Sequence, residues 1–396
     1  MTHRERILAA LRRQPVDRLP WVPRLDLWYK ANRYCGTLPR EWADASLMDI
    51  LGDLGVGFHA VIPDFLDVED PDQMADAALG LHHVPNCPAR VRFRKVARTV
   101  ERDGDTILVR YRLPQGELTA RLLHTEEMRR SGVTLLHVQE RMVKCLEDYA
   151  LVGALFEDLE VEYAPGRYEA LCDRVGDDGL VVAWAGIASS PVHHLLKELV
   201  PYDQFYFDLH DHPNVVLDTA RRMEGYLLQV LDACCRSRAE AVLFGANYDL
   251  MVTPPPLFAE HIAPWLRRAG DMLHAAGKLL ITHTDGENEQ LNRFYVESGV
   301  DVADSVCPAP MTRLTLAEYR DQLGDRTAIW GGLCSVCVLP ESMSDAQFEA
   351  HVSGALESIG DGRGIVFGLA DTTPPAASVD RIRRIGDMMA SFGPVA

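Results

Sequence analysis

The sequence contains no apolar run long enough to cross a membrane. A membrane-spanning helix needs about 18 or more consecutive apolar residues, and every run in this chain is shorter. No secretory leader is expected, because the segment from Met1 to about Arg13 has the pattern of an amphipathic helix. These absences predict a cytoplasmic protein.

Positive charge is scarce in this chain. It has 40 Lys and Arg against 58 Asp and Glu, which gives a formal net charge of −18. Affinity for nucleic acid depends on neutralising phosphates with basic side chains, so a nucleic-acid partner is not expected. A locally basic pocket for an acidic small molecule stays open, and so does a docking surface for another protein.

The cysteines lack the spacing of a zinc ribbon. Of the nine cysteines, only Cys334 and Cys337 form a C-x-x-C pair, and no second pair follows. A chain of 396 residues with 47% hydrophobic content can bury a large core without disulfides. Reduced thiols are therefore the default expectation for a cytosolic chain.

Eight short apolar or β-branched runs are present, and most are followed by a helical pattern. Such alternation predicts a parallel sheet, and nearly continuous apolar strands agree with a sheet that is covered on both sides. Eight such units close a (β/α)8 TIM barrel, with a doubly wound open sheet as the main alternative. The predicted strands cover residues 21–26, 57–62, 180–186, 241–246, 278–283, 300–304, 327–331 and 364–368.

One region departs from this alternation. Residues 91–123 alternate as a small antiparallel meander, with a hairpin signal at Asp103-Gly104. Two helices are expected to follow, over residues 125–130 and 135–155. We therefore predict a single domain over residues 1–396, with an N-terminal helix and an insertion at about 68–178 that forms a flap or a dimer contact.

Polar residues follow most of the predicted strands. In a barrel the carboxyl ends of the strands form the catalytic face, so these side chains are expected to converge there. The residues in question are Arg24, Asp26, Asp64, Phe65, Asn247, Tyr248, Asp249, His283, Asp285, Asp304, Cys307 and Asp371.

The strongest of these signals is His283 with Asp285, at the end of the run LLITHTDG. Side chains alternate along a strand, so residues i and i+2 project to the same side. An imidazole beside a carboxylate makes half of a metal site or an acid/base pair. The alternative is a histidine that an aspartate holds for packing alone.

Each remaining candidate has a role and an alternative. Asp249 and Asp371 precede turn sequences where Asp is a common cap, and Asp26 can also be a cap. Cys307 is a candidate metal ligand whose alternative is packing, and Arg24 is costly to bury unless it is paired.

The candidate catalytic residues are Asp249, Asn247, Asp371 and Asp26. The candidate substrate-binding residues are Arg24, Asp64, Phe65, Tyr248 and Trp28. The candidate metal ligands are His283, Asp285 and Cys307, while an oxygen-only set of Asp249, Asn247 and Asp371 would favour magnesium. The surface histidines are expected to be His193, His194, His210 and His212.

Several segments resemble the uroporphyrinogen decarboxylase superfamily. They are residues 4–11 (RERILAAL), 15–20 (PVDRLP), 273–278 (LHAAGK) before His283, 298–301 (SGVD), 329–333 (IWGGL) and 364–367 (GIVF). The resemblance covers most of the chain outside the insertion, and it implies a single (β/α)8 barrel.

The resemblance is nearer to the cobalamin-dependent methyltransferase branch than to true uroporphyrinogen decarboxylase. In that branch a His-x-Cys pair and a later cysteine hold zinc, and a corrinoid carries the methyl group. His283 matches the first ligand, whereas Asp285 stands in place of the first cysteine, and Leu369 or its neighbour in place of the last. The resemblance thus implies a site with an oxygen ligand for zinc or for another divalent metal.

The decarboxylase branch uses no metal and holds the substrate carboxylates with an arginine-rich rim. Its first-strand signature is Met-Arg-Gln-Ala-Gly-Arg-Tyr, but here Leu25 and Asp26 follow Arg24, and Arg33-Tyr34 comes too late.

The leading hypothesis is therefore a metal-dependent methyltransferase or demethylase. It would move a methyl group between a small substrate and a corrinoid, either free or on a partner protein. The alternatives are a metal-free decarboxylase of a small or tetrapyrrole carboxylic acid, and a non-catalytic corrinoid- or porphyrin-binding protein. Members of the superfamily are often dimers, which leaves a homodimer open.

Overall fold

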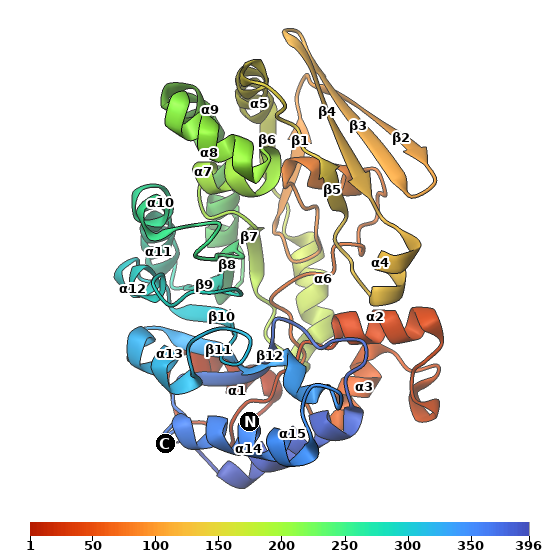
Figure 1. Ribbon diagram of the computed structural model, residues 1–396, viewed down its shortest axis with the longest axis vertical. Coiled ribbons are helices and arrows are strands. Elements are labelled where there is room, and N and C mark those ends of the chain that lie inside the picture. Colours follow the sequence, from red (N-terminus) through yellow and green to blue (C-terminus); the bar gives the residue numbers. More distant parts are fainter. Residues whose placement is uncertain (396) are drawn as a thin grey trace.

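The computed structural model describes residues 1–395, and its centre is a parallel sheet (Figure 1). The six strands lie in the order β12-β11-β10-β9-β8-β7, and every neighbouring pair is parallel. All residues of β8, β10, β11 and β12 are buried, as expected for strands with helices on one face and a packed interior on the other. The strands are β7 (Ala183–Gly186), β8 (Ala241–Ala246), β9 (Leu279–His283), β10 (Val302–Val306), β11 (Ala328–Cys334) and β12 (Ile365–Ala370).

Two extended segments near the N-terminus close this sheet into a ring. The segment at Trp21 pairs in parallel with β12, and the segment at Phe58 pairs in parallel with the chain just before β7. A further hydrogen bond joins the two segments to each other. The closing bonds are Val22 N to Phe367 O (2.8 Å), Gly57 N to Trp21 O (3.0 Å), Phe58 N to Asp178 O (2.7 Å) and Val182 N to Ala60 O (2.9 Å).

The ring confirms the predicted (β/α)8 barrel and excludes the open sheet. We call the eight extended segments of the barrel its staves. The first two staves, at Trp21 and Phe58, are held by single bridges, so they carry few of the ladder bonds that define a regular strand. Both nevertheless lie where the sequence predicts strands.

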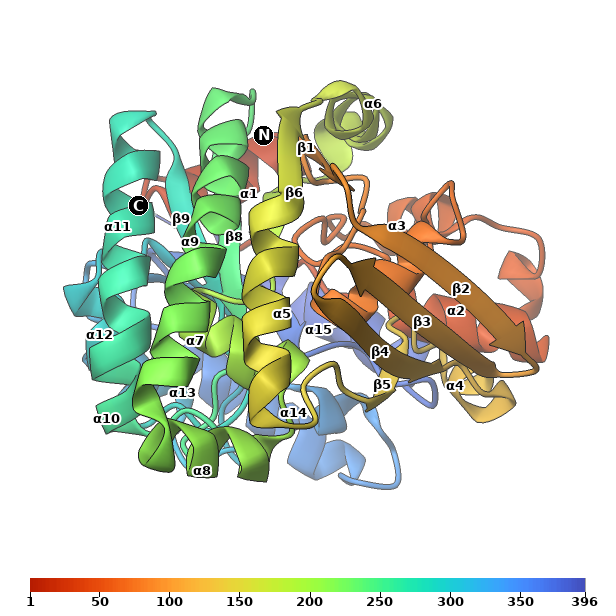
Figure 2. The ribbon, with the colours of Figure 1, turned by 90° about the horizontal axis from the view of Figure 1, so that it is seen from above.

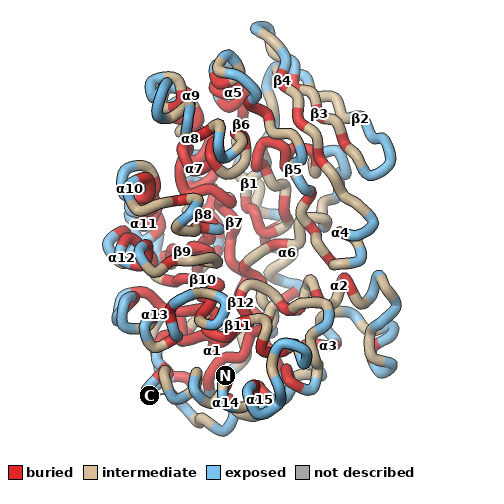
Figure 3. The backbone as a smooth tube through the Cα atoms, in the orientation of Figure 1, coloured by how far each residue is buried: buried red, intermediate tan, exposed pale blue. Residues whose placement is uncertain are grey.

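Helices surround the ring on its outer side. In Figures 1 and 2, α5, α9 and α11 stand side by side over β7, β8 and β9, and Figure 3 shows their outer surfaces exposed and the strands buried. The α-helices are α1 (His3–Leu11), α2 (Asp26–Cys35), α3 (Leu47–Leu54), α4 (Glu126–Ser131), α5 (Leu146–Asp158), α6 (Gly166–Val175), α7 (Pro191–His194), α8 (Tyr202–Asp211), α9 (Pro213–Arg236), α10 (Pro255–Leu257), α11 (Ala263–Ala275), α12 (Asn292–Glu297), α13 (Leu316–Leu323), α14 (Asp345–Ser358) and α15 (Val379–Phe392).

Short 3-10 and π segments complete the helical structure. The 3-10 segments are η1 (Arg40–Trp42), η2 (Gln73–Leu79), η3 (Gly176–Asp178) and η6 (Ser335–Val338), and the π segments are η4 (Leu195–Leu199) and η5 (Phe258–Ile262). Among the described residues, no helix is both long enough and apolar enough to span a membrane.

Helix α9 illustrates why these segments are helical. Its buried residues recur every three or four positions, at Val216, Ala220, Met223, Leu227 and Val230, which makes one apolar stripe facing the barrel. Burial of one such large aliphatic side chain contributes roughly 1.5–3 kcal/mol. Tertiary packing of the stripe therefore stabilises α9 more than helix propensity does.

Between the second and third staves the chain forms antiparallel structure. One sheet has the order β2-β3-β4-β5, and a separate ribbon pairs β1 with β6. The hairpin expected at Asp103-Gly104 is present, and Gly104 takes a φ of 56° in its turn. The strands are β1 (Ala89–Phe93), β2 (Ala97–Asp103), β3 (Thr106–Leu113), β4 (Gly116–Leu123), β5 (His137–Glu140) and β6 (Leu159–Tyr163).

This region differs from the sequence prediction in two places. The run from Val91, expected to belong to the meander, lies in β1, which pairs with β6 in the separate ribbon. A helix was expected over residues 135–155, but His137–Glu140 joins the sheet as β5, and α5 begins only at Leu146. The edge of β4 needs backbone partners, and that tertiary demand overrides local propensity. The single domain over residues 1–396, with an insertion at 68–178, stays a prediction.

Candidate active site at the barrel mouth

Four segments of the ring deliver polar side chains to its carboxyl end, which we call the barrel mouth. Strand β9 ends at His283, and β10 carries Asp304 in the next strand, paired with His283 in register. Strand β12 ends at Ala370, directly before Asp371, and Arg24 follows the first stave. Parallel strands end at the same edge, so residues distant in sequence meet there.

His283 is the centre of this cluster. Its Nδ1 lies 2.6 Å from Asp304 Oδ2, and only 3% of the residue is exposed. A carboxylate can only accept, so Nδ1–H donates to Asp304. The other ring nitrogen, Nε2, lies 3.1 Å from Asp371 Oδ1 and 3.6 Å from Asp285 Oδ1. One imidazole therefore faces three carboxylates.

These charges shift the pKa of each group. Burial alone would lower the pKa of His283, but the carboxylates of Asp285 and Asp371, together with the hydrogen bonds to Asp304 and Asp371, raise it to about 10. Burial would raise the pKa of Asp304, yet the hydrogen bond from His283 and the nearby imidazole of His59 lower it to about 2. Burial keeps the pKa of Asp285 above its usual value. The cluster thus carries an excess of negative charge that a cation would offset.

Arg24 balances part of this charge. Its Nη1 lies 3.1 Å from Asp371 Oδ1, and its Nε lies 3.1 Å from Asp26 Oδ1. Burial would raise the pKa of Asp371, but Arg24 and His283 lower it well below its usual range. Asp26 is also the first residue of α2, where a carboxylate favours the helix dipole. Both carboxylates beside Arg24 hold its guanidinium in place.

A second histidine lies behind Asp304. His59 Nε2 is 3.6 Å from Asp304 Oδ1, and the His59 ring packs edge-on against Trp330 with centroids 5.3 Å apart. Asp304 therefore lies between two imidazoles. The sequence analysis gave Asp304 no role in the site, and it did not identify His59. The alternation of Gly57–Ile62 offered a signal, because it predicts that His59 lies within a stave.

The atoms around His283 Nε2 fit a metal ion. One ligand atom each from His283, Asp285 and Asp371, which we call the His–Asp–Asp cluster, lie within 4.8 Å of one another. One nitrogen and two carboxylate oxygens suit zinc or a similar divalent ion and leave a coordination position open. Asp304 on Nδ1 is the carboxylate partner that metal-ligating histidines usually have. The types of the three ligand atoms and the hydrogen bond from His283 to Asp304 are therefore both those of a metal site.

The backbone beside this cluster has unusual geometry. Asn247, just after β8, has a φ of 60°, and its Nδ2 donates to Asp285 Oδ2 at 3.2 Å. Ser305 has a φ of 63° at an irregularity in the pairing of β10 with β11. Left-handed non-glycine residues and bulges are costly, and they concentrate at functional sites. Both occur here at the mouth of the barrel.

Two candidate residues lie near the cluster without joining it. Cys307 is buried, and its Sγ lies 4.0 Å from the carbonyl oxygen of Ala370 rather than among the His–Asp–Asp ligand atoms. Burial raises the pKa of this thiol to about 12, which disfavours a thiolate. Asp249 is used by the backbone, since its carboxylate accepts from the N–H groups of Met251 (2.8 Å) and Glu287 (2.9 Å). Cys307 therefore matches its alternative role as a packing residue, and Asp249 matches its alternative role as a cap.

Four further candidates have other surroundings. Tyr248 is fully buried, and its hydroxyl is 2.9 Å from Thr282 Oγ1 in the barrel core. Trp28 packs outside the ring in a small apolar cluster with Trp42 and Ile50. Asp64 forms an ion pair with Lys30. The remaining candidate, Phe65, packs edge-on against His82 and Trp184.

The prediction of four surface histidines is half wrong. His210 and His212 are exposed, but His193 and His194 are buried. His193 stacks on Tyr248, and His194 Nε2 bonds to the carbonyl of Leu79 at 2.6 Å. Both lie in α7, which packs against α9, η4 and η5. The sequence pattern placed them outside any strand end and gave no sign of this packing.

Lys197 follows them in the π segment η4. This lysine is half-buried, and burial lowers its pKa. It is near enough to Asp285 to influence that carboxylate. π segments inside helices are frequent at functional sites. The charge of Lys197 is a second cation beside the cluster that the sequence did not reveal.

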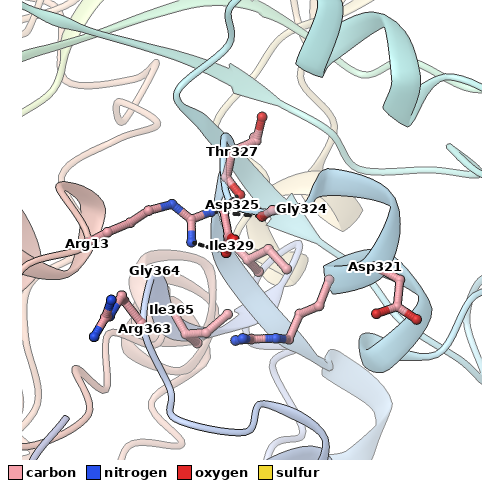
Figure 4. A pocket seen from close by; sticks show the side chains of 10 residues that line it. Arg13, Asp321, Gly324, Asp325, Thr327, Ile329, Arg363, Gly364 and Ile365 are labelled. Atoms are coloured by element: carbon pink, nitrogen blue, oxygen red, sulfur yellow. Dashed lines mark hydrogen bonds and ion pairs between the residues drawn. The ribbon is translucent and has the colours of Figure 1, made fainter. Parts of the chain in front are cut away.

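A separate pocket of about 270 Å³ lies at the opposite end of the ring (Figure 4). Arg13, Arg320 and Arg363 line it, beside the amino ends of β11 and β12. Arg13 donates to the carbonyls of Gly324 and Thr327, so it holds loops together. Polar groups at this end of a barrel serve stability, whereas chemistry belongs to the mouth.

Comparisons with known proteins agree with this architecture. A search among curated proteins found no match. A methyltransferase from Methanosarcina mazei has a similar structure, with a TM-score of 0.59 and 14% sequence identity, over 99% of this chain and 99% of that chain. The likeness in structure supports the fold. The family model described as uroporphyrinogen decarboxylase (URO-D) matches residues 169–392, which is more than half of the chain. The chain therefore belongs to the uroporphyrinogen decarboxylase (URO-D) family.

Proposed function

We propose that this protein is a metal-dependent methyltransferase or demethylase that acts on a small substrate at the barrel mouth. The observation that carries the proposal is the His–Asp–Asp cluster, in which His283, Asp285 and Asp371 each offer a ligand atom within 4.8 Å of the others. Zinc is the ion that we expect there, since imidazole and carboxylate are both common zinc ligands.

In this proposal the protein fixes the site before any ligand binds. Asp304 accepts from His283 Nδ1 at 2.6 Å, which orients the ring so that Nε2 faces Asp371 and Asp285, where the ion would replace its proton. Arg24 holds Asp371 at 3.1 Å, and Asn247 holds Asp285 at 3.2 Å. Each proposed ligand therefore has its own hydrogen-bond partner, which limits the reorganisation needed when the ion and the substrate arrive.

A divalent ion at this place would act as a Lewis acid that lowers the pKa of a bound nucleophile or polarises a methyl–heteroatom bond. The remaining chemistry would be carried by a corrinoid as methyl carrier, free or on a partner protein. Arg24 and Asp26 lie beside Asp371, and the charge of Lys197 acts on Asp285, so these three side chains would position polar parts of the substrate. The exposed fraction of the Asp371 side chain, 37%, leaves that ligand open to the outside.

The similar structure of a methyltransferase supports this reading at the level of the fold. The ligand set differs from the thiolate-rich zinc site of the resembling branch, because Asp285 stands where that branch has cysteine. Carboxylate is a harder ligand than thiolate, so the proposed site should bind zinc less tightly and accept manganese or magnesium more readily. Metal preference is therefore part of what the experiment must measure.

The metal-free decarboxylase reading depended on Arg24 as the holder of a substrate carboxylate. Asp26 and Asp371 already occupy this guanidinium on two sides. A substrate carboxylate would have to compete with two carboxylates of the protein. The same charges make the cluster a better place for a cation than for an anion.

The test is methyl transfer from methylcobalamin to small thiol acceptors, followed by the change in corrin absorbance. The protein is assayed as purified, after treatment with a chelator, and after zinc is restored. We expect about one metal ion per site, loss of activity with the chelator, and recovery with zinc.

His283→Ala should remove both the bound metal at this site and the activity. The matched control is His274→Ala, because His274 also forms a close pair with an aspartate, Asp301, at 2.7 Å but lies outside the mouth. Full activity in chelated protein, or in His283→Ala, would contradict a metal-dependent reaction and favour metal-free acid chemistry at this site.

A further inference from the structure

Two cysteines and a histidine form a second cluster away from the barrel mouth. One ligand atom each from Cys334, Cys337 and His351 lie within 4.8 Å of one another. Cys334 Sγ is 3.3 Å from His351 Nε2. Both cysteines are fully buried, and His351 is half-buried. The C-x-x-C pair of the sequence therefore has a third partner, supplied by a helix.

The cluster joins three elements of the fold. Cys334 is the last residue of β11, Cys337 lies in η6, and His351 lies on α14. Helix α14 covers the outside of the ring beside β11 in Figure 1, so these side chains meet between the sheet and its helical cover. None of the three belongs to the His–Asp–Asp cluster.

The loop that carries the cysteines is held rigidly. Arg381 of α15 is buried, and its guanidinium donates to the carbonyl oxygens of Cys337 (3.0 Å) and Leu339 (3.0 Å). It also binds the Asp345 carboxylate at 2.8 Å. Ser378 N donates to Val338 O at 2.9 Å. Supporting bonds of this kind fix ligand positions in metal sites and lower the cost of ordering the loop.

We propose that Cys334, Cys337 and His351 bind a zinc ion as a second metal site, independent of the proposed active site. Two thiolates and one imidazole are a common zinc ligand set, and three protein ligands leave a fourth position for water or another small ligand. Next to His351 lies a pocket of about 260 Å³ between α13 and α14, lined also by Pro308, Leu316 and Gly332. Of the three proposed ligands, His351 lines this pocket.

The proposed ion would tie α14 to the end of β11. Metal binding stabilises the folded state when the site does not exist in the unfolded chain. Helix α14 otherwise contacts the ring through few buried residues, chiefly Phe348 and Val352. A zinc ion at its middle would therefore hold this helix in register with the loop that Arg381 supports.

Cobalt(II) distinguishes this site from the one at the barrel mouth. Thiolate ligands give cobalt an intense charge-transfer absorption in the near ultraviolet, whereas a site of nitrogen and oxygen does not. Reduced, metal-free protein is titrated with cobalt chloride. We expect a charge-transfer band that saturates at one ion per chain, remains in His283→Ala, and is displaced by zinc.

Variants at His351 provide the decisive test, because this residue is half-buried on a helix and we expect the fold to accept a substitution there. His351→Ala should weaken cobalt binding at least tenfold, and His351→Cys, which restores a ligand, should recover the band. Cys334→Ser with Cys337→Ser should abolish it. Cys145→Ser, at an exposed lone cysteine, is the matched control and should leave it unchanged.

A folded wild-type protein without the band would overturn the proposal. So would a band that survives the double serine variant or that does not respond to His351→Ala. Circular dichroism of each variant separates loss of metal from loss of fold. Zinc should also raise the Tm of the wild-type chain more than that of His351→Ala. Failure of this site would leave the His–Asp–Asp cluster untouched, because that cluster contributes no thiolate.

Discussion

The strongest quantitative prediction concerns how pH governs metal binding at the barrel mouth. In the metal-free protein, three carboxylates around His283 raise its pKa to about 10. A metal ion needs the Nε2 lone pair, so it must displace a proton wherever the pH lies below that pKa. Proton and metal therefore compete for the same atom.

This competition fixes the direction and the size of the pH dependence of metal affinity. One proton is released per ion bound below about pH 10, so the apparent association constant should rise about tenfold per pH unit. An ordinary histidine, with a pKa near 6.5, would be almost fully deprotonated above about pH 7.5 and would give little further gain. Between about pH 7 and pH 9 the expected increase is therefore about 100-fold, or about 2.7 kcal/mol, against about 1.3-fold for an unperturbed imidazole.

The assay is a competition titration of zinc against a chelator of known affinity at several pH values, with proton release measured by calorimetry in two buffers. Asp304→Asn removes the carboxylate on Nδ1, lowers the pKa of His283 and should flatten the pH dependence. Asp301→Asn is the control, since it removes the carboxylate partner of His274 outside the mouth. Zinc affinity that is flat from about pH 7 to pH 9 in the wild type would refute the reasoning.

Three other substitutions test the fold and the charge network. Arg24→Ala leaves two carboxylates without their buried partner and should lower the free energy of unfolding by about 3 kcal/mol, measured by urea denaturation; equal stability would contradict the buried pair. Gly245→Ala should destabilise the protein by more than about 1 kcal/mol, because a Cβ there overlaps the Tyr248 hydroxyl and the φ of 84° disfavours other residues. Gly354→Ala, in the exposed interior of α14 with open space around it, should instead stabilise by about 0.5–1 kcal/mol, and opposite signs for this pair in thermal unfolding are the check.

The barrel could be predicted from the sequence because its signals are local. Each stave is a short apolar run, and a parallel sheet needs little more than those runs and the helices between them. Strand β5 was missed for the opposite reason: residues 137–140 are extended because β4 offers them an edge, which no local pattern records. Insertions of this kind depend on long-range pairing.

The site was predictable in part for the same reason. His283, Asp285 and Asp371 each follow a strand, so the barrel brings them together once its closure is assumed. Tyr248 follows a strand too, but its ring turns into the core, and sequence position does not reveal side-chain direction at a strand end.

The cluster of Cys334, Cys337 and His351 could not be found from sequence spacing. Cys334 and Cys337 form a recognisable pair, but their third partner, His351, comes from a helix beyond a loop. Helical packing against the sheet decides which face of α14 meets the cysteines. Only tertiary structure joins a half-buried helical histidine to a strand end.

The central claim is that one ion lies between His283, Asp285 and Asp371, and anomalous diffraction at the zinc absorption edge tests it most directly. Crystals of protein loaded with zinc should give an anomalous peak at bonding distance from His283 Nε2 and from an oxygen of each aspartate. A mouth without a peak in zinc-loaded crystals, with His283 still bridging the carboxylates through its own protons, would contradict the account.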